Sequence, residues 1–261
     1  MNLLENKAIQ IANKNIKDKI RHWQYLVFSL GFAVMFTLLF YFFLGREVFQ
    51  YAFPGMIIYT TAAGTTSAAI SFAVDKTSGM LERLDTMPTG RKNLFLGALL
   101  SETLMISLQI LIMFILGYAV LQVPFKGIFE IFIGFFIAVL FGISAVGIGI
   151  IISGIAKTPE IANAIALFYY MPILFLSGSL WPFESAIVFF TPPYWAKQVF
   201  LQITVLGDGL FDPLYSSSLF GPTGTAQQLP ITLFGGLLVV IAFTLAFIIL
   251  GIIIFQKKTK F

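Results

Sequence analysis

The stretch IFEIFIGFFIAVLFGISAVGIGIIISGI, residues 128–155, carries one charged side chain, Glu130, and decides how this chain folds. An α-helix rises about 1.5 Å per residue, so about 20 apolar residues cross a hydrocarbon core that is about 30 Å thick. Residues 128–155 exceed that length. Because backbone amides cannot remain unpaired in lipid, and because a helix pairs them internally, this stretch predicts a transmembrane helix.

Most of the remaining chain has the same character. Hydrophobic residues make up 58% of the sequence and charged residues 11%, whereas average soluble domains have about 45–50% and about 25%. The sequence therefore predicts an all-α integral membrane protein with six transmembrane helices, in which residues 25–261 form the membrane domain. The other five predicted spans are residues 25–44, 53–74, 94–121, 161–180 and 230–255.

The lysine and arginine residues indicate the orientation, because those in short loops tend to stay on the cytoplasmic side. If the N-terminus is inside, the outer segments hold only Arg46, Lys126 and Lys197 of the 16 basic residues. An even number of spans then places both termini in the cytoplasm, and the basic balance needs no nucleic-acid partner to explain it. The cytoplasmic basic residues are Lys7, Lys14, Lys17, Lys19, Arg21, Lys76, Arg83, Arg91, Lys92, Lys157, Lys257, Lys258 and Lys260.

Residues 1–24 precede the first span and predict a cytoplasmic amphipathic helix that lies in the membrane interface. Basic side chains lie away from its apolar face, where anionic lipid headgroups can meet them. A frayed basic leader is the alternative interpretation. The apolar face consists of residues at spacings of three or four, which are Ile9, Ala12, Ile16, Ile20 and Trp23.

The segment between the fifth and sixth predicted spans, residues 181–229, is long and apolar for an outer loop. Two pieces of it, residues 186–190 and 199–206, are too short to cross a bilayer, and a Thr-Pro-Pro sequence separates them. We expect these pieces to be re-entrant helices that are covered by protein where they dip into the outer leaflet. Residues 207–229 are rich in Gly, Pro, Ser and Thr and predict an exposed loop.

Several kinds of chemistry are missing from the sequence. The phosphate-binding pattern G-x-x-x-x-G-K-[ST] needs a Gly-Lys pair, and the chain contains none. The chain has no cysteine and one histidine, His22, so it can build no cysteine or multi-histidine metal cluster. We interpret His22, which lies beside Trp23 before the first predicted span, as an interfacial residue and not as the base of a Ser-His-Asp triad. We therefore expect that the protein is not an enzyme, that it binds no metal or cofactor, and that any ATP is hydrolysed by a separate chain.

One ionisable residue, Glu102, lies clearly inside a predicted span, about two turns past the cytoplasmic end of the third. Gln109 follows two turns later on a similar face, so these two residues define a candidate intramembrane polar site. Glu102 either contacts an arginine or lysine near the inner mouth or extends alone to the inner interface. Ion-coupled carriers usually show several such groups, so an energy source in another chain is the better hypothesis.

The connection after the second span resembles a segment of a known family. It reads DKTSGMLERL at 75–84, followed by MPTGR at 87–91. This is similar to the D-x-x-x-G-x-[LF]-E-R-L … P-[ILV]-[ST]-R segment of ABC-2 type transporter permeases, the six-span membrane subunits of ABC exporters. Phe53-Pro54-Gly55 resembles their Pro-Gly entry into the second span. The sequences LSGSLWPFE at 176–184 and PPYW at 192–195 resemble their outer segment.

The spacing of apolar residues in this connection agrees with the role that the resemblance implies. Met80, Leu84 and Met87 are spaced i, i+4, i+7 and share one face of a short helix. In the family this is the coupling helix, which docks on the ATP-binding subunit through apolar contacts and charge. A basic loop that only fixes the topology is the alternative. The predicted partner-binding residues are Asp75, Gly79, Met80, Leu81, Glu82, Arg83, Leu84 and Met87.

The resemblance also implies a function and partners. It implies a multi-pass permease of the plasma (inner) membrane that pairs with a second copy, as a homodimer, and with two ABC ATP-binding subunits that bind ATP and magnesium. A hydrophobic or amphipathic substrate of the drug, lipid or glycan class would leave the cytoplasm between the two copies, in contact with membrane lipid. An ATP-independent secondary carrier or lipid scramblase is one alternative. A membrane assembly subunit without a transported substrate is another.

Overall fold

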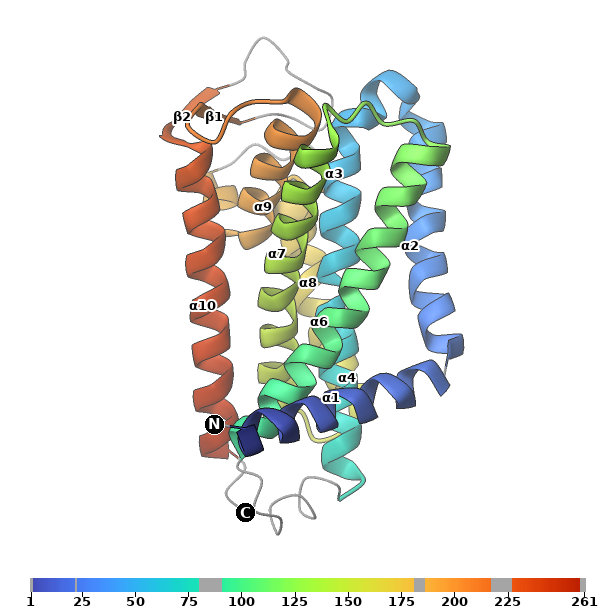
Figure 1. Cartoon of the computed structure of the whole chain (residues 1–261), viewed down its shortest axis with the longest axis vertical. Coiled ribbons are helices and arrows are strands. Elements are labelled where there is room, and N and C mark those ends of the chain that lie inside the picture. Colours follow the sequence, from blue (N-terminus) through green and yellow to red (C-terminus); the bar gives the residue numbers. More distant parts are fainter. Residues whose placement is uncertain (1, 22, 80–90, 181–185, 217–226, 259–261) are drawn as a thin grey trace.

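The computed structural model describes residues 2–21, 23–79, 91–180, 186–216 and 227–258. Long helices lie side by side in a bundle, and one helix, α1, lies crosswise at one end (Figure 1). We call this the α1 end, and the opposite end, which carries two strands, the β end. The long helices are α1 (Asn2–Arg21), α2 (Trp23–Leu44), α3 (Arg46–Ala62), α4 (Gly64–Thr77), α6 (Arg91–Ile115), α7 (Ile128–Ile155), α8 (Pro159–Leu176), α9 (Pro192–Leu201) and α10 (Leu233–Lys258).

Five helical stretches are long and apolar enough to cross a membrane. They confirm the helical membrane class that the sequence predicts. Among the described residues of α2, the apolar stretch Leu30–Leu44 is shorter, so the count of six spans stays a prediction. The five stretches are Arg46–Thr77, Phe95–Val120, Ile128–Ile155, Pro159–Leu176 and Leu233–Ile254.

The second predicted span consists of two helices, α3 and α4, that meet at Ala63. α3 begins at Arg46, before the predicted boundary at residue 53. The prediction followed the apolar run, which starts later because the first turn of α3 is charged. The Ala63 amide still donates to the Tyr59 carbonyl oxygen at 3.1 Å. The chain therefore continues through the break without leaving the bundle.

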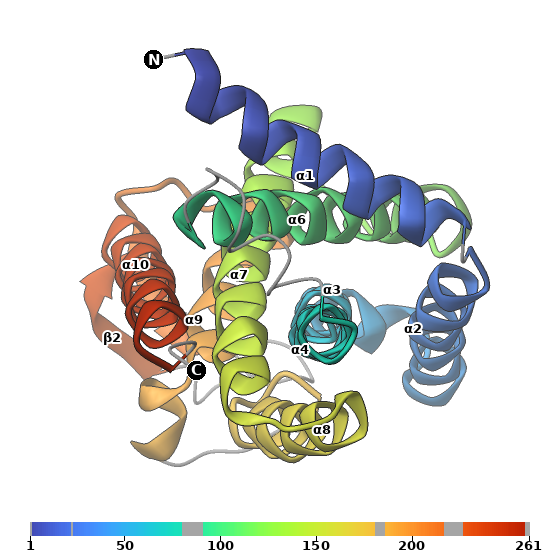
Figure 2. The same cartoon turned by 90° about the horizontal axis from the view of Figure 1, so that it is seen from below.

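α7 is the central helix of the bundle, with α4 against one side and α10 against another (Figure 2). The contact with α4 is close because Gly149 lacks a side chain. A Cβ at Gly149 would lie 2.4 Å from the Thr65 carbonyl oxygen. Ala145 and Ser153, which belong to the same row of small residues, are buried as well. Small residues therefore let these backbones approach where lipid provides no hydrophobic drive for association.

The apolar pieces after α8 are joined differently from the prediction. Thr191 precedes α9, and two prolines occupy the first turn of this helix, where a backbone N–H is not needed. α9 continues directly into a π-helical turn, η3 (Gln202–Leu206), so residues 199–206 are not a separate helix. The first piece is a short 3₁₀ turn, η2 (Ala186–Phe190). Every residue of α9 is buried, while its entry into a leaflet stays a prediction.

The described part of residues 207–229 contains strands, which corrects the prediction of an exposed loop. β1 (Pro213–Ser216) and β2 (Gln227–Thr232) pair in antiparallel fashion. Leu214 and Leu229 are buried and give the strands an inward side. The strands could not be predicted because they are short and because the segment is rich in turn-forming residues.

α1 is helical as predicted, but its predicted apolar face is divided. Ala12 is only 3% exposed, whereas Ile9 and Ile20 are 56% and 58% exposed. The difference arises because α1 packs against α6, which covers part of the face (Figure 2). The exposed isoleucines leave an apolar edge, so the interfacial position of α1 stays a prediction.

Candidate functional site

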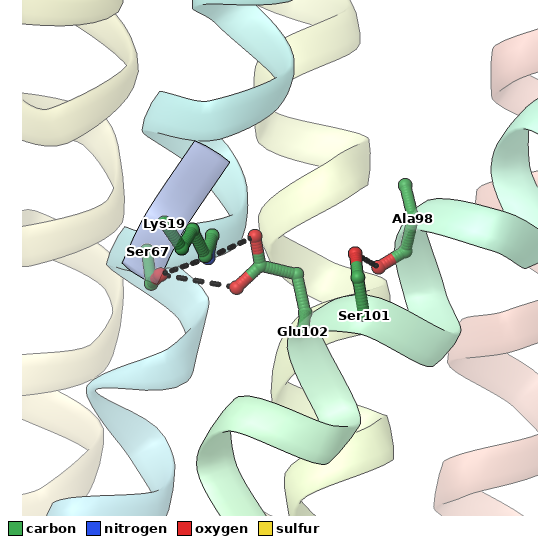
Figure 3. A network of polar contacts seen from close by, with 5 residues as sticks. All are labelled: Lys19, Ser67, Ala98, Ser101 and Glu102. Carbon is green, nitrogen blue, oxygen red and sulfur yellow. Dashed lines mark hydrogen bonds and ion pairs between the residues drawn. The ribbon is translucent and has the colours of Figure 1, made fainter. Parts of the chain in front are cut away.

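The buried carboxylate of Glu102, on α6, is the centre of a polar cluster at the α1 end. Its side chain is 2% exposed. Lys19 of α1 reaches it, with the Nζ atom 2.5 Å from Oε1 (Figure 3). A buried carboxylate is tolerated when a cation and hydrogen bonds compensate its lost hydration. The structure thus places Glu102 in an ion pair with a lysine, while its functional role stays a prediction.

Ser67 of α4 completes this cluster. Its hydroxyl donates to Oε2 of Glu102 at 3.0 Å, and it accepts a hydrogen bond from Lys19 Nζ at 3.1 Å (Figure 3). Each of the three residues comes from a different helix, α1, α4 or α6. We call Lys19, Ser67 and Glu102 the polar clamp, because they join these three helices.

The backbone of α6 allows α1 to come close enough for the polar clamp to form. At Gly97, a Cβ would lie 2.8 Å from the carbonyl oxygen of Ala8 and 2.9 Å from Cβ of Ile11. Any larger residue there would push α1 away from α6. The clamp therefore depends on a glycine more than one turn before Glu102.

We expect Gly97→Val to detach α1 from α6, because its side chain has no room beside the Ala8 backbone. The chain has no cysteine, so a cysteine introduced at the buried Ala12 reports this detachment by its rate of thiol labelling. Labelling should rise about tenfold or more, which corresponds to a loss of about 1.4 kcal/mol of docking free energy. Gly154→Val is the matched control, since a Cβ there meets only Ile254 at an ordinary 3.6 Å. Equal labelling in both variants would contradict this account of the α1–α6 contact.

The polar clamp lies between the two helices that flank residues 80–90. α4 ends at Thr77 and α6 begins at Arg91. Asp75, in the last turn of α4, interacts electrostatically with Lys19 and Glu102 of the clamp. Gly79 has a φ of 68°, a left-handed conformation that favours glycine directly after the helix. The other predicted partner-binding residues lie outside the described residues, and these are Met80, Leu81, Glu82, Arg83, Leu84 and Met87.

Gln109 is partly buried on α6, two turns beyond Glu102. Among the described residues, no hydrogen bond joins it to the polar clamp. The structure therefore gives Glu102 two partners that the sequence did not name, Lys19 and Ser67, rather than Gln109. Lys19 could not be singled out because several lysines and arginines precede the first span.

A second buried polar residue, Lys197 of α9, was missed by the sequence analysis. It is 1% exposed, and its Nζ donates to the carbonyl oxygen of Gly178 at 2.7 Å. By its position in the sequence it is one of the three basic residues of the predicted outer segments. The available signal was its position inside an apolar segment, between Trp195 and Val199.

Gly178 belongs to the Ser-Gly-Ser sequence that follows α8. The Ser177 hydroxyl lies 2.8 Å from that of Ser179 and donates to the Leu174 carbonyl oxygen at 2.9 Å. The carbonyl oxygen of Ser179 lies against Gly55 of α3, where a Cβ would be only 2.0 Å away. Two segments that carry the family resemblance, residues 53–55 and the described residues 176–180, therefore meet in space. We call Gly55, Ser177, Gly178, Ser179 and Lys197 the Gly178 junction.

Comparison with known proteins identifies the family of this chain. The family model for the ABC-2 type transporter matches residues 7–203, a range that includes both the polar clamp and the Gly178 junction. The chain belongs to this family of membrane transport proteins, which confirms the resemblance seen in the sequence.

Two curated relatives give a closer comparison. The chain is 28% identical over 170 residues to "Probable multidrug ABC transporter permease YbhR" of Escherichia coli (strain K12), covering 63% of this chain and 46% of that protein. It is 27% identical over 133 residues to "ABC transporter G family member 20" of Dictyostelium discoideum, covering 51% of this chain and 18% of that protein. The chain thus matches less than half the length of each relative.

Proposed function

We propose that this chain is the membrane subunit of an ATP-driven ABC exporter. It pairs with a second copy, as a homodimer, and with two separate ATP-binding subunits. It moves a hydrophobic or amphipathic substrate of the drug, lipid or glycan class out of the cytoplasm along the interface between the two copies. Membership of the ABC-2 type family supports this proposal, as does the similarity to the Escherichia coli relative named "Probable multidrug ABC transporter permease YbhR".

The observation that carries the proposal is the polar clamp, which joins the two helices that precede and follow residues 80–90 in the chain. Force applied to this segment acts on α4 and α6, and the clamp connects both helices to α1. α4 is also attached to the end of α7, because Lys76 Nζ donates to the Ala156 carbonyl oxygen at 3.2 Å. Docking of a partner on residues 75–87 would therefore act on four helices together, which is what a coupling element requires.

The orientation follows from the distribution of lysine and arginine. In this proposal α2 is also a membrane span, which brings the number of spans to six. Both termini then lie in the cytoplasm, and the α1 end faces the ATP-binding subunits. ATP and magnesium are bound by those subunits, and this chain itself binds neither. Its own part is mechanical, since its helices receive the movement at the α1 end and pass it to the β end. The protein resides in the plasma (inner) membrane.

We expect the combined change Glu82→Arg and Arg83→Glu to weaken docking of the ATP-binding subunit, because like charges at an interface can oppose association by several kcal/mol. Leu84→Asp should do similar harm by placing an uncompensated charge in an apolar groove. Copurification of the ATP-binding subunit and transport in membrane vesicles, at equal amounts of each variant, measure the effect. Both should fall about tenfold or more.

Lys157→Gln is the matched control, since it removes an exposed charge from another connection on the same proposed side. It should leave docking and transport unchanged. Normal copurification of the ATP-binding subunit with both the charge-reversed variant and Leu84→Asp would exclude residues 75–87 as the docking element. Transport by the purified chain without any ATP-binding subunit would exclude the exporter proposal itself.

A further inference from the structure

Lys197 is a buried cation for which the described part of the chain supplies no carboxylate partner. Its side chain is 1% exposed, and among the described residues no carboxylate forms an ion pair with it. The carbonyl oxygen of Gly178 is its hydrogen-bond acceptor. An ammonium group carries three donors, so one acceptor leaves it poorly compensated for its lost hydration. This differs from the polar clamp, in which Lys19 and Glu102 neutralise each other.

The surroundings of Lys197 explain why its charge is unfavourable there. Burial lowers the pKa of Lys197 from its ordinary value near 10.5 to about 8, and no charged neighbour contributes to this shift. α9 lies outside the five candidate spans and packs against α3, α7, α10, η2, η3 and β1. Among the residues of these elements and of α9 whose side chains are described, the titratable groups besides Lys197 are Arg46, Glu47, Tyr51 and Tyr59 on α3, Glu130 on α7, Tyr215 on β1 and Tyr194 on α9.

The position of Lys197 connects its hydration to a movement of the bundle. Its hydrogen bond joins α9 to the backbone that follows α8, and the next residue of that backbone touches α3 at Gly55. The Nζ atom is shielded from water in this arrangement. Separation of these elements would admit water to Lys197.

We propose that Lys197 is a positioning residue for the release step of transport, whose hydration favours opening of the Gly178 junction at the β end. The proposal rests on the proposed function, in which the β end faces outward. At neutral pH the side chain is mostly protonated, so the closed junction holds a charged group that water would stabilise. Because the pKa is lower in the closed state than in water, proton binding favours the open state. Closure should become more favourable as pH rises from about 8 towards about 10.5.

Thiol labelling of the purified full-length chain in detergent tests this without any substrate. A cysteine at the buried Ser179 reports opening, and the natural chain contains no other cysteine. Labelling rates of the cysteine are compared at the same pH between the protein that keeps Lys197 and the protein that also carries Lys197→Met. The pH dependence of the thiol itself then cancels. At about pH 7 the Lys197 protein should be labelled more than about tenfold faster. At about pH 9.5 this ratio should shrink by about tenfold.

Two further variants separate this role from ordinary packing. Lys197→Arg keeps its charge at every accessible pH, so its labelling relative to Lys197→Met should stay high at about pH 9.5. Lys126→Met removes an exposed lysine near the same end and should leave labelling unchanged. Thermal unfolding of each variant confirms that it is folded.

Equal labelling of the Lys197 and Lys197→Met proteins, faster labelling of Lys197→Met, or a ratio independent of pH would overturn the proposal. Transport assays with the ATP-binding subunit keep the two proposals apart. Slower transport by Lys197→Met with normal docking of that subunit would support the release role. Loss of ATP dependence in the unchanged protein would count against the proposed function and not against Lys197.

Discussion

Gly55→Ala is expected to destabilise the protein by about 3 kcal/mol, the upper part of the range for overfilled cores. The added Cβ would lie 2.0 Å from the Ser179 carbonyl oxygen, which belongs to the backbone and cannot rotate away. α3 and the segment after α8 would have to separate, and the hydrogen bond from Lys197 to Gly178 would be strained. Thermal or denaturant unfolding in detergent measures the loss.

Gly31→Ala is the matched control for this prediction. Gly31 lies in α2, and a Cβ there meets no atom within 4 Å. Because alanine favours a helix over glycine by about 0.5–1 kcal/mol, this change should be neutral or slightly stabilising. Similar stabilities of the two alanine variants would show that Gly55 and Ser179 can separate at little cost in free energy of unfolding.

Glu102→Gln and Lys19→Gln should each destabilise the protein by about 3 kcal/mol, because each leaves the other charge buried without its partner. The double change to Glu102→Leu and Lys19→Met should cost clearly less than the sum, since it removes both charges and keeps the volume. Unfolding in detergent measures all of these variants.

Lys17→Gln tests whether the effect belongs to the pair. Lys17 is exposed on the same helix, two residues before Lys19. Its loss should change stability by no more than about 0.5 kcal/mol. If Lys19→Gln were as mild as Lys17→Gln, the ion pair with Glu102 would contribute little, and the polar clamp would be a weak contact.

The long helices could be predicted from the sequence because a bilayer imposes both a length and a composition. That argument located α7, α8 and α10 to within a few residues, and likewise α6 together with the π-helical turn Leu116–Val120 that continues it. It was less accurate for α3, whose charged first turn continues the helix beyond the apolar run. It also failed for β1 and β2, because strands this short carry little periodic signal.

Half of each polar site was visible in the sequence. Glu102 stood out as a carboxylate in an apolar stretch, but its partner Lys19 lies 83 residues earlier, among other basic residues. Lys197 could not be recognised because a lysine in a connection between two predicted spans is ordinary. Only the folded structure shows that α9, which carries this lysine, is buried. Sequence periodicity describes one helix at a time, whereas both sites are made by helices that meet only in the folded bundle.

The separation of Lys19 and Glu102 along the chain also sets an order of assembly. α1 precedes α6 in the chain, so its contact with Glu102 can form only after the third predicted span has been synthesised. A carboxylate that enters an apolar medium without a counter-charge faces a penalty of about 2.5–3.5 kcal/mol. If α1 lies at the inner surface, as the sequence predicts, Lys19 would be present when Glu102 inserts and would lower that penalty. In that case α1 would assist the insertion of a later span before it becomes part of the finished bundle.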